Sequence, residues 1–459
     1  MGKILKKRFL KIRFHVAAPM IVGNGMAQNT DNDVARDSRG LPYIPGSAVA
    51  GVIRNALKGS GAPEISRYLG DAENIAGTWE EFQRAPRITE SRLVFYDATM
   101  DPEYRDKYRV SVRDGVGLNK FKNVKRGAKF DLEVLEPGVE FVTYAEQNVE
   151  SEDDLDYLPY IVTALMSRPV SFGAKSTRGY GRISDLQFRR MDFDFTGDPR
   201  DKEHSAREYL DFNMYDDKSW KNAEPADGNV SRNDADGVCI LRLGLQLTGG
   251  ISIRKYTAAV NSKVEHLDFQ QLTVQDVKTD KEIPVVPGTS WAGAFRHQIE
   301  RLSPGASVYH GSGNNGEDKI EHNYFGLVSG DTKERSDIYF SESQIRGGSD
   351  KILSRSSIDR FTGGAANGAL FTEQVHYGGS TELEITFHRP HASGGYTSDF
   401  LSTFAAACAD LHEGILPVGG ETSIGRGVFR ITDINGKPFS GNGEEVYHVV
   451  CGILKEIEE

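Results

Sequence analysis

Apolar and polar residues alternate in two stretches that lie about 240 residues apart in the chain. The alternating positions are Leu10, Ile12, Phe14 and Val16 in the first stretch and Leu241, Leu243, Leu245 and Leu247 in the second. A period of two is typical of a β-strand with one buried face. Each half of the chain is therefore expected to begin with a half-buried strand.

Three further landmarks follow each strand in the same order. A Pro-Gly turn runs into an amphipathic helix, an aromatic residue and a glycine precede a second strand, and a later helix leads into a glycine-rich loop. These landmarks lie at residues 41–57, 68–70 and 171–183 in the first half and at 283–299, 324–326 and 417–429 in the second. Four landmarks in register predict an internal duplication.

The order of elements in each half is strand, helix, strands, helix, strand. This order predicts an α+β fold of two tandem ferredoxin-like (RRM-like, βαββαβ) units. Such a unit presents an open antiparallel sheet, which is a common platform for RNA. We expect a first domain at residues 1–190 and a second at 237–459.

Residues 191–236, between these domains, are acidic and lack apolar periodicity. They hold 6 Lys and Arg residues against 13 Asp and Glu residues. A segment of this composition is expected to be a linker or surface insertion that is partly disordered.

Composition changes this interpretation little. A length of 459 residues favours at least two cores. The net charge of −11 argues against a nucleic-acid partner at first sight. Once the acidic segment is set aside, the charge of the remaining chain no longer excludes such a partner. Three scattered cysteines favour a reducing compartment. No apolar stretch approaches the ~20 residues that span a bilayer, so we expect a cytoplasmic protein without a membrane partner.

The Pro-Gly turns are candidate phosphate sites. Ser47 follows the first turn and is expected to N-cap the helix, whose terminus attracts anions. Arg54 and Arg296 lie two turns further on, in equivalent positions of the two halves. A plain capped helix, with each arginine in a salt bridge, is the alternative.

The glycine-rich loops read GAKSTRGYG in the first half and GGETSIGRG in the second. Their glycines permit close approach to a ligand and expose N–H groups that can bind phosphate. The first loop adds Lys175 and Arg178, and the second adds only Arg426, in a shifted position. Neither loop has the spacing of a P-loop or of a dinucleotide fold. An ordinary glycine-rich connection is the alternative.

The PYIPGS turn, the arginine-bearing helix and the GxxSxRGYG loop together resemble the RAMP superfamily of CRISPR-associated proteins. The chain is most similar to the backbone subunits of type III effector complexes, which polymerise along the guide RNA. The tract SRSSIDRFTGGAANGALFTEQV at 354–375 is a strong match, and its counterpart at 108–135 is diverged. Two such units in one chain resemble the fused subunits of type III-D-like systems.

The resemblance implies RNA-binding roles for both halves. The residues implied to contact the guide backbone are Ser47, Arg54, Gly173, Lys175, Ser176, Arg178, Ser290, Arg296 and Arg426. A thumb-like hairpin inserted in each unit is implied to wedge between bases of the guide–target duplex. Its candidate residues are Lys120, Lys122, Lys125 and Arg126 in the first unit and Arg360 and Phe361 in the second. A solvated hairpin is the alternative.

The resemblance also implies a catalytic aspartate in the loop before the first Pro-Gly turn. Asp31 matches that position, with Asp33 as a nearby substitute, and would support cleavage of target RNA with Mg²⁺ or Mn²⁺. In the second half the matching register falls on Gln270, so Asp268 is the candidate for a second cut. A solvated acidic loop is the alternative.

Three functions follow from this resemblance. The first is an endoribonuclease subunit that binds guide RNA, target RNA and other CRISPR effector subunits. The second is a guide-holding scaffold that cuts nothing. The third is a ribonuclease that processes guide precursors through a histidine, with His15 and His266 as candidates.

Overall fold

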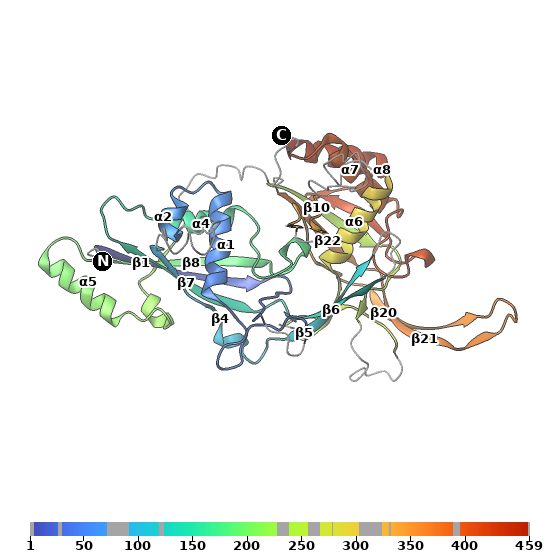
Figure 1. Ribbon diagram of the computed structural model, residues 1–459, viewed down its shortest axis with the longest axis horizontal. Coiled ribbons are helices and arrows are strands. Elements are labelled where there is room, and N and C mark those ends of the chain that lie inside the picture. The colour runs from blue at the N-terminus through green and yellow to red at the C-terminus, as the bar shows by residue number, and fades with distance from the viewer. Residues whose placement is uncertain are drawn as a thin grey trace.

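The computed structural model describes residues 4–25, 30–70, 91–118, 124–226, 238–255, 267–277, 279–302, 324–329, 332–388 and 395–457. The chain is a mixed α/β protein with many antiparallel strands, arranged as two units side by side (Figure 1). Each unit has its own sheet and its own buried core.

The sheet of the first unit is centred on strand β1 (Lys6–Val16). β1 pairs in antiparallel fashion with β7 (Glu140–Val149) on one side and with β8 (Ile183–Asp194) on the other. The far edge of β7 pairs with the short strands β3 (Leu93–Phe95) and β4 (Ala98–Met100). Among the described residues, helices α1 (Gly46–Gly59), α2 (Ile65–Leu69) and α4 (Leu158–Ser167) contribute to the core of this unit.

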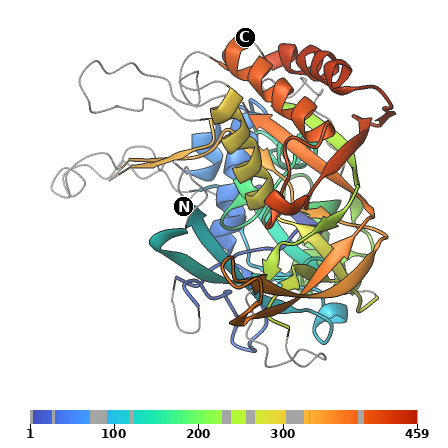
Figure 2. The ribbon, with the colours of Figure 1, turned by 90° about the vertical axis from the view of Figure 1, so that its right-hand side faces the viewer.

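The second unit repeats this arrangement around strand β10 (Val238–Leu247). β10 lies between β22 (Ser380–His388) and β23 (Phe429–Ile434), and β22 also pairs with β18 (Ile338–Phe340). The helices α6 (Gly288–Leu302), α7 (Ser398–His412) and α8 (Gly443–Leu454) gather on one side of this sheet (Figure 2). Both strand orders are compatible with the expected arrangement.

A long hairpin projects from each unit. It consists of β5 (Val110–Leu118) and β6 (Val124–Leu135) in the first unit. In the second unit it consists of β20 (Ser349–Ile358) and β21 (Ala365–Tyr377), which extend away from the body of the molecule (Figure 1). The remaining strands are β2 (Tyr43–Ile44), β9 (Glu224–Pro225), β11 (Gly250–Ile251), β12 (Arg254–Lys255), β13 (Gln270–Gln271), β14 (Thr273–Gln275), β15 (Glu282–Val286), β16 (Leu327–Ser329), β17 (Thr332–Glu334), β19 (Ser343–Gln344) and β24 (Lys437–Pro438).

The alternating residues of the two central strands form the floor of the two cores, as expected. Leu10, Ile12, Phe14 and Val16 pack into the first core and Leu241, Leu243, Leu245 and Leu247 into the second. Each of these eight side chains is at most 2% exposed. The period of two therefore places one face of each strand against the helices.

The acidic segment, expected to be a partly disordered linker or surface insertion, is folded over residues 191–226 and covers part of the first unit. Residues up to Asp194 continue strand β8, and helix α5 (Pro199–Asp211) follows. Trp220 is 1% exposed and shares a small core with Phe9, Val142, Tyr144 and Phe193. The outer face of the first sheet is therefore not open.

Acidic side chains of this cover neutralise basic ones on the sheet. Lys11 of β1 is only 6% exposed and bonds to Asp217, and Arg13 lies 3.3 Å from the same carboxylate. The local excess of acid thus serves internal pairing as well as the surface. None of the helices in the described ranges is long and apolar enough to cross a membrane.

Replacing Trp220 by alanine tests the cover. Trp220→Ala should lower the free energy of unfolding of the first unit by about 3–5 kcal/mol, because it empties a buried aromatic site. Leu210→Ala is the matched control, since Leu210 is 80% exposed on α5. Urea unfolding followed by circular dichroism measures both. Equal unfolding midpoints for the two variants would contradict the assignment.

Candidate nucleic-acid interface

The two glycine-rich loops adopt the same backbone conformation. Lys175 and Glu421 occupy equivalent positions and both have a φ of 56°. One turn of 3₁₀ helix follows in each, at Ser176–Arg178 and at Thr422–Ile424. The duplication seen in the sequence therefore extends to the dihedral angles of these loops.

Three of the glycines in these loops are required by close packing within their own unit, which leaves no room for a Cβ atom. A Cβ atom at Gly181 or at Gly427 would lie 1.8 Å from the carbonyl oxygen of Phe172 or Val418, respectively. A Cβ atom at Gly173 would lie 2.1 Å from the carbonyl oxygen of Ile21. The loop must lie this close to its own unit whether or not RNA is present.

Lys175 differs from its counterpart Glu421 in its surroundings. Its ammonium nitrogen lies 3.7 Å from the ring centroid of Phe130 on hairpin strand β6. Burial lowers the pKa of Lys175 to about 8. The side chain links the glycine loop of the first unit to the base of the hairpin, where it is still half-exposed.

Arg178 and Ser176 of the first loop reach the second unit. Arg178 donates to the carbonyl oxygen of Phe325 at 2.8 Å and to the hydroxyl of Ser336 at 3.4 Å. Burial, and after it the nearby charge of Arg296, lowers the pKa of Arg178 to about 10. Ser176 accepts a hydrogen bond from Arg335 at 3.0 Å. These predicted guide contacts lie at the junction between the units.

Two glycines let the backbones meet at this junction. A Cβ atom at Gly179 would lie 2.4 Å from the amide nitrogen of Glu342. A Cβ atom at Gly288, the first residue of α6, would lie 2.4 Å from the carbonyl oxygen of Arg178. The glycine loop of the first unit thus sits directly on the Pro-Gly turn of the second.

Ion pairs surround this contact. Arg113 of β5 is 4% exposed and pairs with Glu342 of the second unit and with Glu136. Arg182 pairs with Glu384 of β22 at 2.5 Å, and Arg242 joins the same carboxylate at 2.9 Å. Burial favours a raised pKa for Glu384, but the two guanidinium groups outweigh it and hold the pKa below its ordinary value.

The first Pro-Gly turn does not use Ser47 as an N-cap, so that expectation is wrong. Helix α1 begins at Gly46, Pro45 occupies the N-cap position, and no side chain caps it. The amide of Gly46 instead donates to the carboxylate of Asp97 at 2.7 Å. Ser47 is exposed, and Ser290 in the second unit is half-buried.

The paired arginines of α1 and α6 make different contacts. Arg54 donates to the carbonyl oxygens of Leu69 at 2.5 Å and Gly70 at 3.1 Å, which end helix α2. Arg296 donates to Glu300, four residues further along its own helix. Both guanidinium groups have internal partners.

Arg426 lies inside the second unit. It is 4% exposed, and its guanidinium pairs with Glu373 at 2.8 and 2.5 Å and with Glu421 at 2.5 Å. It occupies the place of Tyr180 rather than that of Arg178, as the shifted position in the sequence indicated. Its contacts tie the glycine loop to hairpin strand β21.

The second hairpin carries the most exposed aromatic residue of the described chain. Phe361 is 99% exposed at the turn between β20 and β21, and Arg360 beside it is exposed as well. The carboxylate of Asp359 accepts from the amides of Phe361 and Thr362 and fixes the turn. Lys120 and Lys122 of the first hairpin lie outside the described residues, as do the side chains of Lys125 and Arg126.

Asp31 and Asp268 occupy equivalent positions in the two units, which the sequence register did not reveal. The carboxylate of Asp31 accepts from the amide of Asp131 at 3.0 Å, and its own amide donates back to the Asp131 carbonyl at 3.2 Å. Asp268 and Thr372 exchange the same two bonds, at 2.7 and 2.8 Å. Both aspartates are exposed and are held against the second strand of the hairpin.

The two aspartate sites differ in one neighbour. Asp131 adds a second carboxylate, which accepts from the amide of Asp31 at 3.0 Å. Thr372, in the same place, shares a hydrogen bond with Ser354. Carboxylate oxygens are ligands that Mg²⁺ and Mn²⁺ accept, so the first site holds two side chains of suitable chemistry where the second holds one. Within the described ranges, no three acidic, His or Cys side chains form a complete metal cluster.

The remaining catalytic candidates from the sequence, Asp33 and His15, contact other groups of the protein. Asp33 is 4% exposed and accepts from the amide and hydroxyl of Thr30, which closes a turn. His15 is half-buried beside the carboxylates of Glu140 at 3.5 Å and Asp185 at 3.8 Å. His266 lies outside the described residues.

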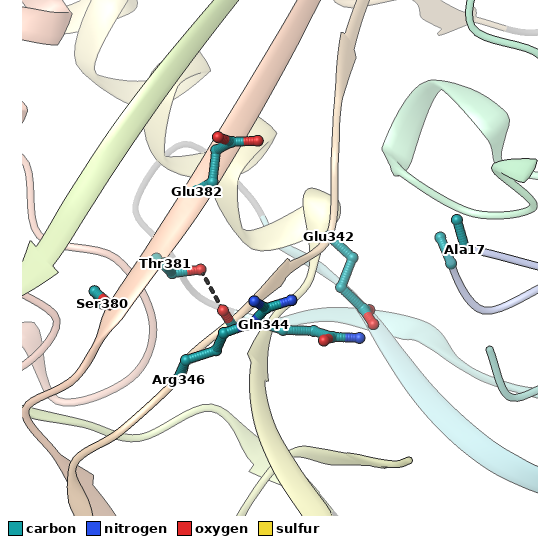
Figure 3. Close-up of a pocket in the computed structure, with 8 residues that line it drawn as sticks. Ala17, Glu342, Gln344, Arg346, Ser380, Thr381 and Glu382 are labelled. Carbon is teal, nitrogen blue, oxygen red and sulfur yellow. Dashed lines mark hydrogen bonds between the residues drawn. The ribbon is translucent and has the colours of Figure 1, made fainter. Parts of the chain in front are cut away.

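A pocket of about 430 Å³ opens where the two units meet (Figure 3). Ala17 and Ala18 line it from the first unit, and Glu342, Gln344 and Arg346 line it from the second. Thr381 donates to the carbonyl oxygen of Gln344 at 2.7 Å and closes one wall. The pocket marks a gap in the junction beside the buried Arg113–Glu342 pair.

Sequence reasoning missed Asp131 and the contacts between the two units. Asp131 stands in a hairpin that diverges from its counterpart, so no shared motif pointed to it. The sequence contains one sign of the contact between the units. Arg178 of the first glycine loop corresponds to an aliphatic residue in the second loop.

Comparison with known proteins gives the class. The sequence model of the RAMP superfamily matches residues 13–184 and 271–430, one match in each unit. The chain therefore belongs to the RAMP superfamily, whose members are CRISPR-associated proteins that generally bind CRISPR RNA and other effector subunits. No curated protein sequence matches the chain significantly.

The lowered pKa of Lys175 gives a testable prediction. Labelling of Lys175 with an acylating reagent, followed by peptide mass spectrometry, should show a pH midpoint near 8 instead of the ordinary 10.5. Phe130→Ala should raise the midpoint, because water then reaches the ammonium and stabilises the charged form. A wild-type midpoint near 10.5 would contradict the burial of this side chain.

Proposed function

We propose that this chain is a guide-RNA-binding backbone subunit of a type III CRISPR effector complex that cleaves target RNA at two sites. The observation that carries the proposal is the equivalence of Asp31 and Asp268, each fixed by the same pair of backbone hydrogen bonds to a hairpin strand. Two equivalent units that each carry one such carboxylate are suited to cutting one RNA strand at two positions.

The proposed fold is a tandem of two ferredoxin-like units, each with an inserted hairpin. Its support is the strand order, in which the first strand of each unit is central. β1 lies between β7 and β8, and β10 lies between β22 and β23. The hairpins β5–β6 and β20–β21 come directly before β7 and β22 in the chain.

The proposed guide path follows the glycine loops and the bases of the hairpins. Lys175 supplies a half-exposed cation at the first loop, and Gly173 and Gly419 are exposed backbone at equivalent places. Phe361 projects from the tip of the second hairpin, where an exposed ring can stack between bases. The covered outer face of the first sheet takes no part in this path.

The proposed cleavage is an in-line attack within the target strand. The 2′-oxygen attacks the adjacent phosphorus and the 5′-oxygen leaves with a proton from solvent, which gives a 2′,3′-cyclic phosphate. Asp31 or Asp268 accepts the 2′-hydroxyl proton or orients that hydroxyl. A divalent cation bound at the first site would neutralise charge on the phosphate. Asp31 and Asp131 would hold it together with oxygen atoms of the RNA and water.

The proposed partners are the guide RNA, the complementary target RNA and other effector subunits, in the cytoplasm. A scaffold that cuts nothing is a second candidate, and one observation favours it. Asp31 and Asp268 each accept a hydrogen bond from the hairpin backbone, which is a structural task in itself.

Isosteric substitutions separate these two candidates. In the assembled guide complex with Mg²⁺, Asp31→Asn should reduce one target cut by at least about 100-fold, and Asp268→Asn should reduce a different cut to a similar extent. The asparagine oxygen can still accept from the hairpin amide, so the loop and the RNA affinity should be preserved.

Asp201→Asn on the exposed surface of α5 is the matched control and should leave both cuts unchanged. Denaturing gels of end-labelled target give the cuts, and filter binding gives the affinity. Survival of both cuts in the double variant, at unchanged RNA affinity, would support the scaffold and exclude cleavage by these residues.

The exposed ring of Phe361 gives a separate prediction for binding. Phe361→Ala should weaken binding of the guide–target duplex by about tenfold, since a stacking contact contributes about 1–3 kcal/mol. Phe361→Trp should preserve the binding. An unchanged dissociation constant for the alanine variant would exclude this ring from the duplex interface.

A further inference from the structure

The outer face of the first sheet, which the acidic segment covers, carries aromatic rings on its two inner strands. Phe9 on β1 and Tyr144 on β7 belong to the small core on this face, and Phe193 joins them from β8. Four-stranded antiparallel sheets with aromatic rings on the inner strands bind single-stranded RNA, because bases stack on the rings. The face beneath the acidic segment therefore has the rings of a nucleic-acid platform.

Cations lie among these rings. Lys11 is directly opposite Tyr144 in the strand register, and Arg189 of β8 is opposite Lys11 on the other side. Lys7 on this face pairs with Glu146 of β7. Within the described part of the chain, however, neither Lys11 nor Arg189 forms an ion pair with a carboxylate of the sheet itself. The sheet alone thus leaves positive charge beside its rings.

The cover, defined as residues 195–226, places rings on these rings. Tyr209 stacks on Phe9, with ring centroids 6.4 Å apart and an angle of 25° between the planes. Trp220 stacks on Tyr144 at 5.9 Å and the same angle. The aromatic side chains of the cover therefore take the places in which bases would stack.

The cover also places acceptors on the cations. Asp217 bonds to Lys11 and lies 3.3 Å from Arg13, and the carbonyl oxygen of Trp220 accepts from Arg189 at 3.4 Å. The hydrogen bond from Lys11, and then the neighbouring positive charges, lower the pKa of Asp217 although burial opposes this. The ionised carboxylate takes the place that a backbone phosphate would have.

The equivalent face of the second unit differs. Its paired positions hold no aromatic ring: Ile240, Arg242 and Gly244 of β10 lie opposite Thr386, Glu384 and Glu382 of β22. Two of these residues are acidic, which disfavours a nucleic acid on this face. The rings and cations of the first unit are therefore not a requirement of the shared fold.

We propose that the outer face of the first sheet is a second site for single-stranded nucleic acid, and that the cover keeps it closed by occupying it as a nucleic acid would. The proposal goes beyond the proposed function and depends neither on cleavage nor on the path of the guide. Helix α5 of the cover lies beside the start of β1, at the end of the first unit that is remote from the second (Figure 1). The closed face confines RNA to the glycine loops and hairpins.

The cover is difficult to displace because it belongs to the same chain. An intramolecular segment has a high effective concentration, so a short oligonucleotide in solution does not compete with it. Its largest anchor is Trp220, which is 1% exposed. Opening the site therefore requires the loss of such anchors.

The experiment opens the cover in the full-length chain by two independent routes. One is Trp220→Ala, and the other combines Tyr209→Ala with Phe212→Ala; circular dichroism and gel filtration verify that each variant is folded. Each chain is mixed with a short oligouridylate RNA or oligothymidylate DNA and irradiated. Peptide mass spectrometry then locates the crosslinks. Opened chains should crosslink through the β1 and β7 peptides that hold Phe9 and Tyr144, and wild-type chain should not.

Leu210→Ala is the matched control, because Leu210 is 80% exposed on α5, and it should behave like the wild type. Adding Tyr144→Ala to an opened chain should weaken the gained binding about tenfold, since it removes a stacking ring. Adding Lys11→Ala should lower the slope of log affinity against log salt concentration by about one, since it removes one phosphate contact.

Crosslinks to β1 and β7 that are lost with Tyr144→Ala would support the site, and the oligonucleotide that binds more tightly identifies RNA or DNA as its source. Folded, opened chains without such crosslinks would overturn the proposal, as would a gain in binding that Tyr144→Ala leaves unchanged. Crosslinks confined to the glycine loops would exclude the second site and leave the proposed function intact.

Discussion

The contact between the two units fixes the positions of the candidate RNA-binding and catalytic residues. Gly179 and Gly288 allow backbone to meet backbone there, and Arg178 fixes the contact through the Phe325 carbonyl. The buried pair of Arg113 and Glu342 adds a charge contact whose loss would leave one partner buried and unpaired. Because these contacts come from the glycine loop and the hairpin base, they set the relative positions of both candidate aspartates.

Each aspartate is positioned by a hairpin more than by its own loop. Asp31 and Asp268 bond to the second strand of hairpins that differ in sequence, yet the bonds are the same in both units. Backbone amides supply them, so they tolerate change in the side chains around them. This explains how the hairpins can diverge while the carboxylates stay in place. The two sites share the same backbone hydrogen bonds but differ in one side chain. Asp131 places a second carboxylate beside Asp31, whereas Thr372 places a hydroxyl beside Asp268.

The sequence predicted the repeat, the central strands and the glycine loops, because each depends on local periodicity or on backbone freedom. It predicted a partly disordered linker or surface insertion at 191–236, and it did not predict that residues 191–226 fold onto the sheet through Trp220, Tyr209 and Phe212, because these residues are thinly spread among charges. It also predicted that Ser47 caps helix α1. In the structure the amide of Gly46 instead donates to the carboxylate of Asp97, which lies in a distant part of the chain. The roles of Arg178 and Arg426 depend on contacts between segments far apart in the chain, which no local pattern encodes.

The proposed function requires that the two equivalent units form one continuous platform for a guide RNA. An electron cryomicroscopy structure of the chain bound to a single guide RNA is the direct test. The RNA should pass both glycine loops and the bases of both hairpins, with Asp31 and Asp268 in equivalent relation to successive segments of the strand. RNA that contacts one unit only, or that lies on the side of α5, would contradict it.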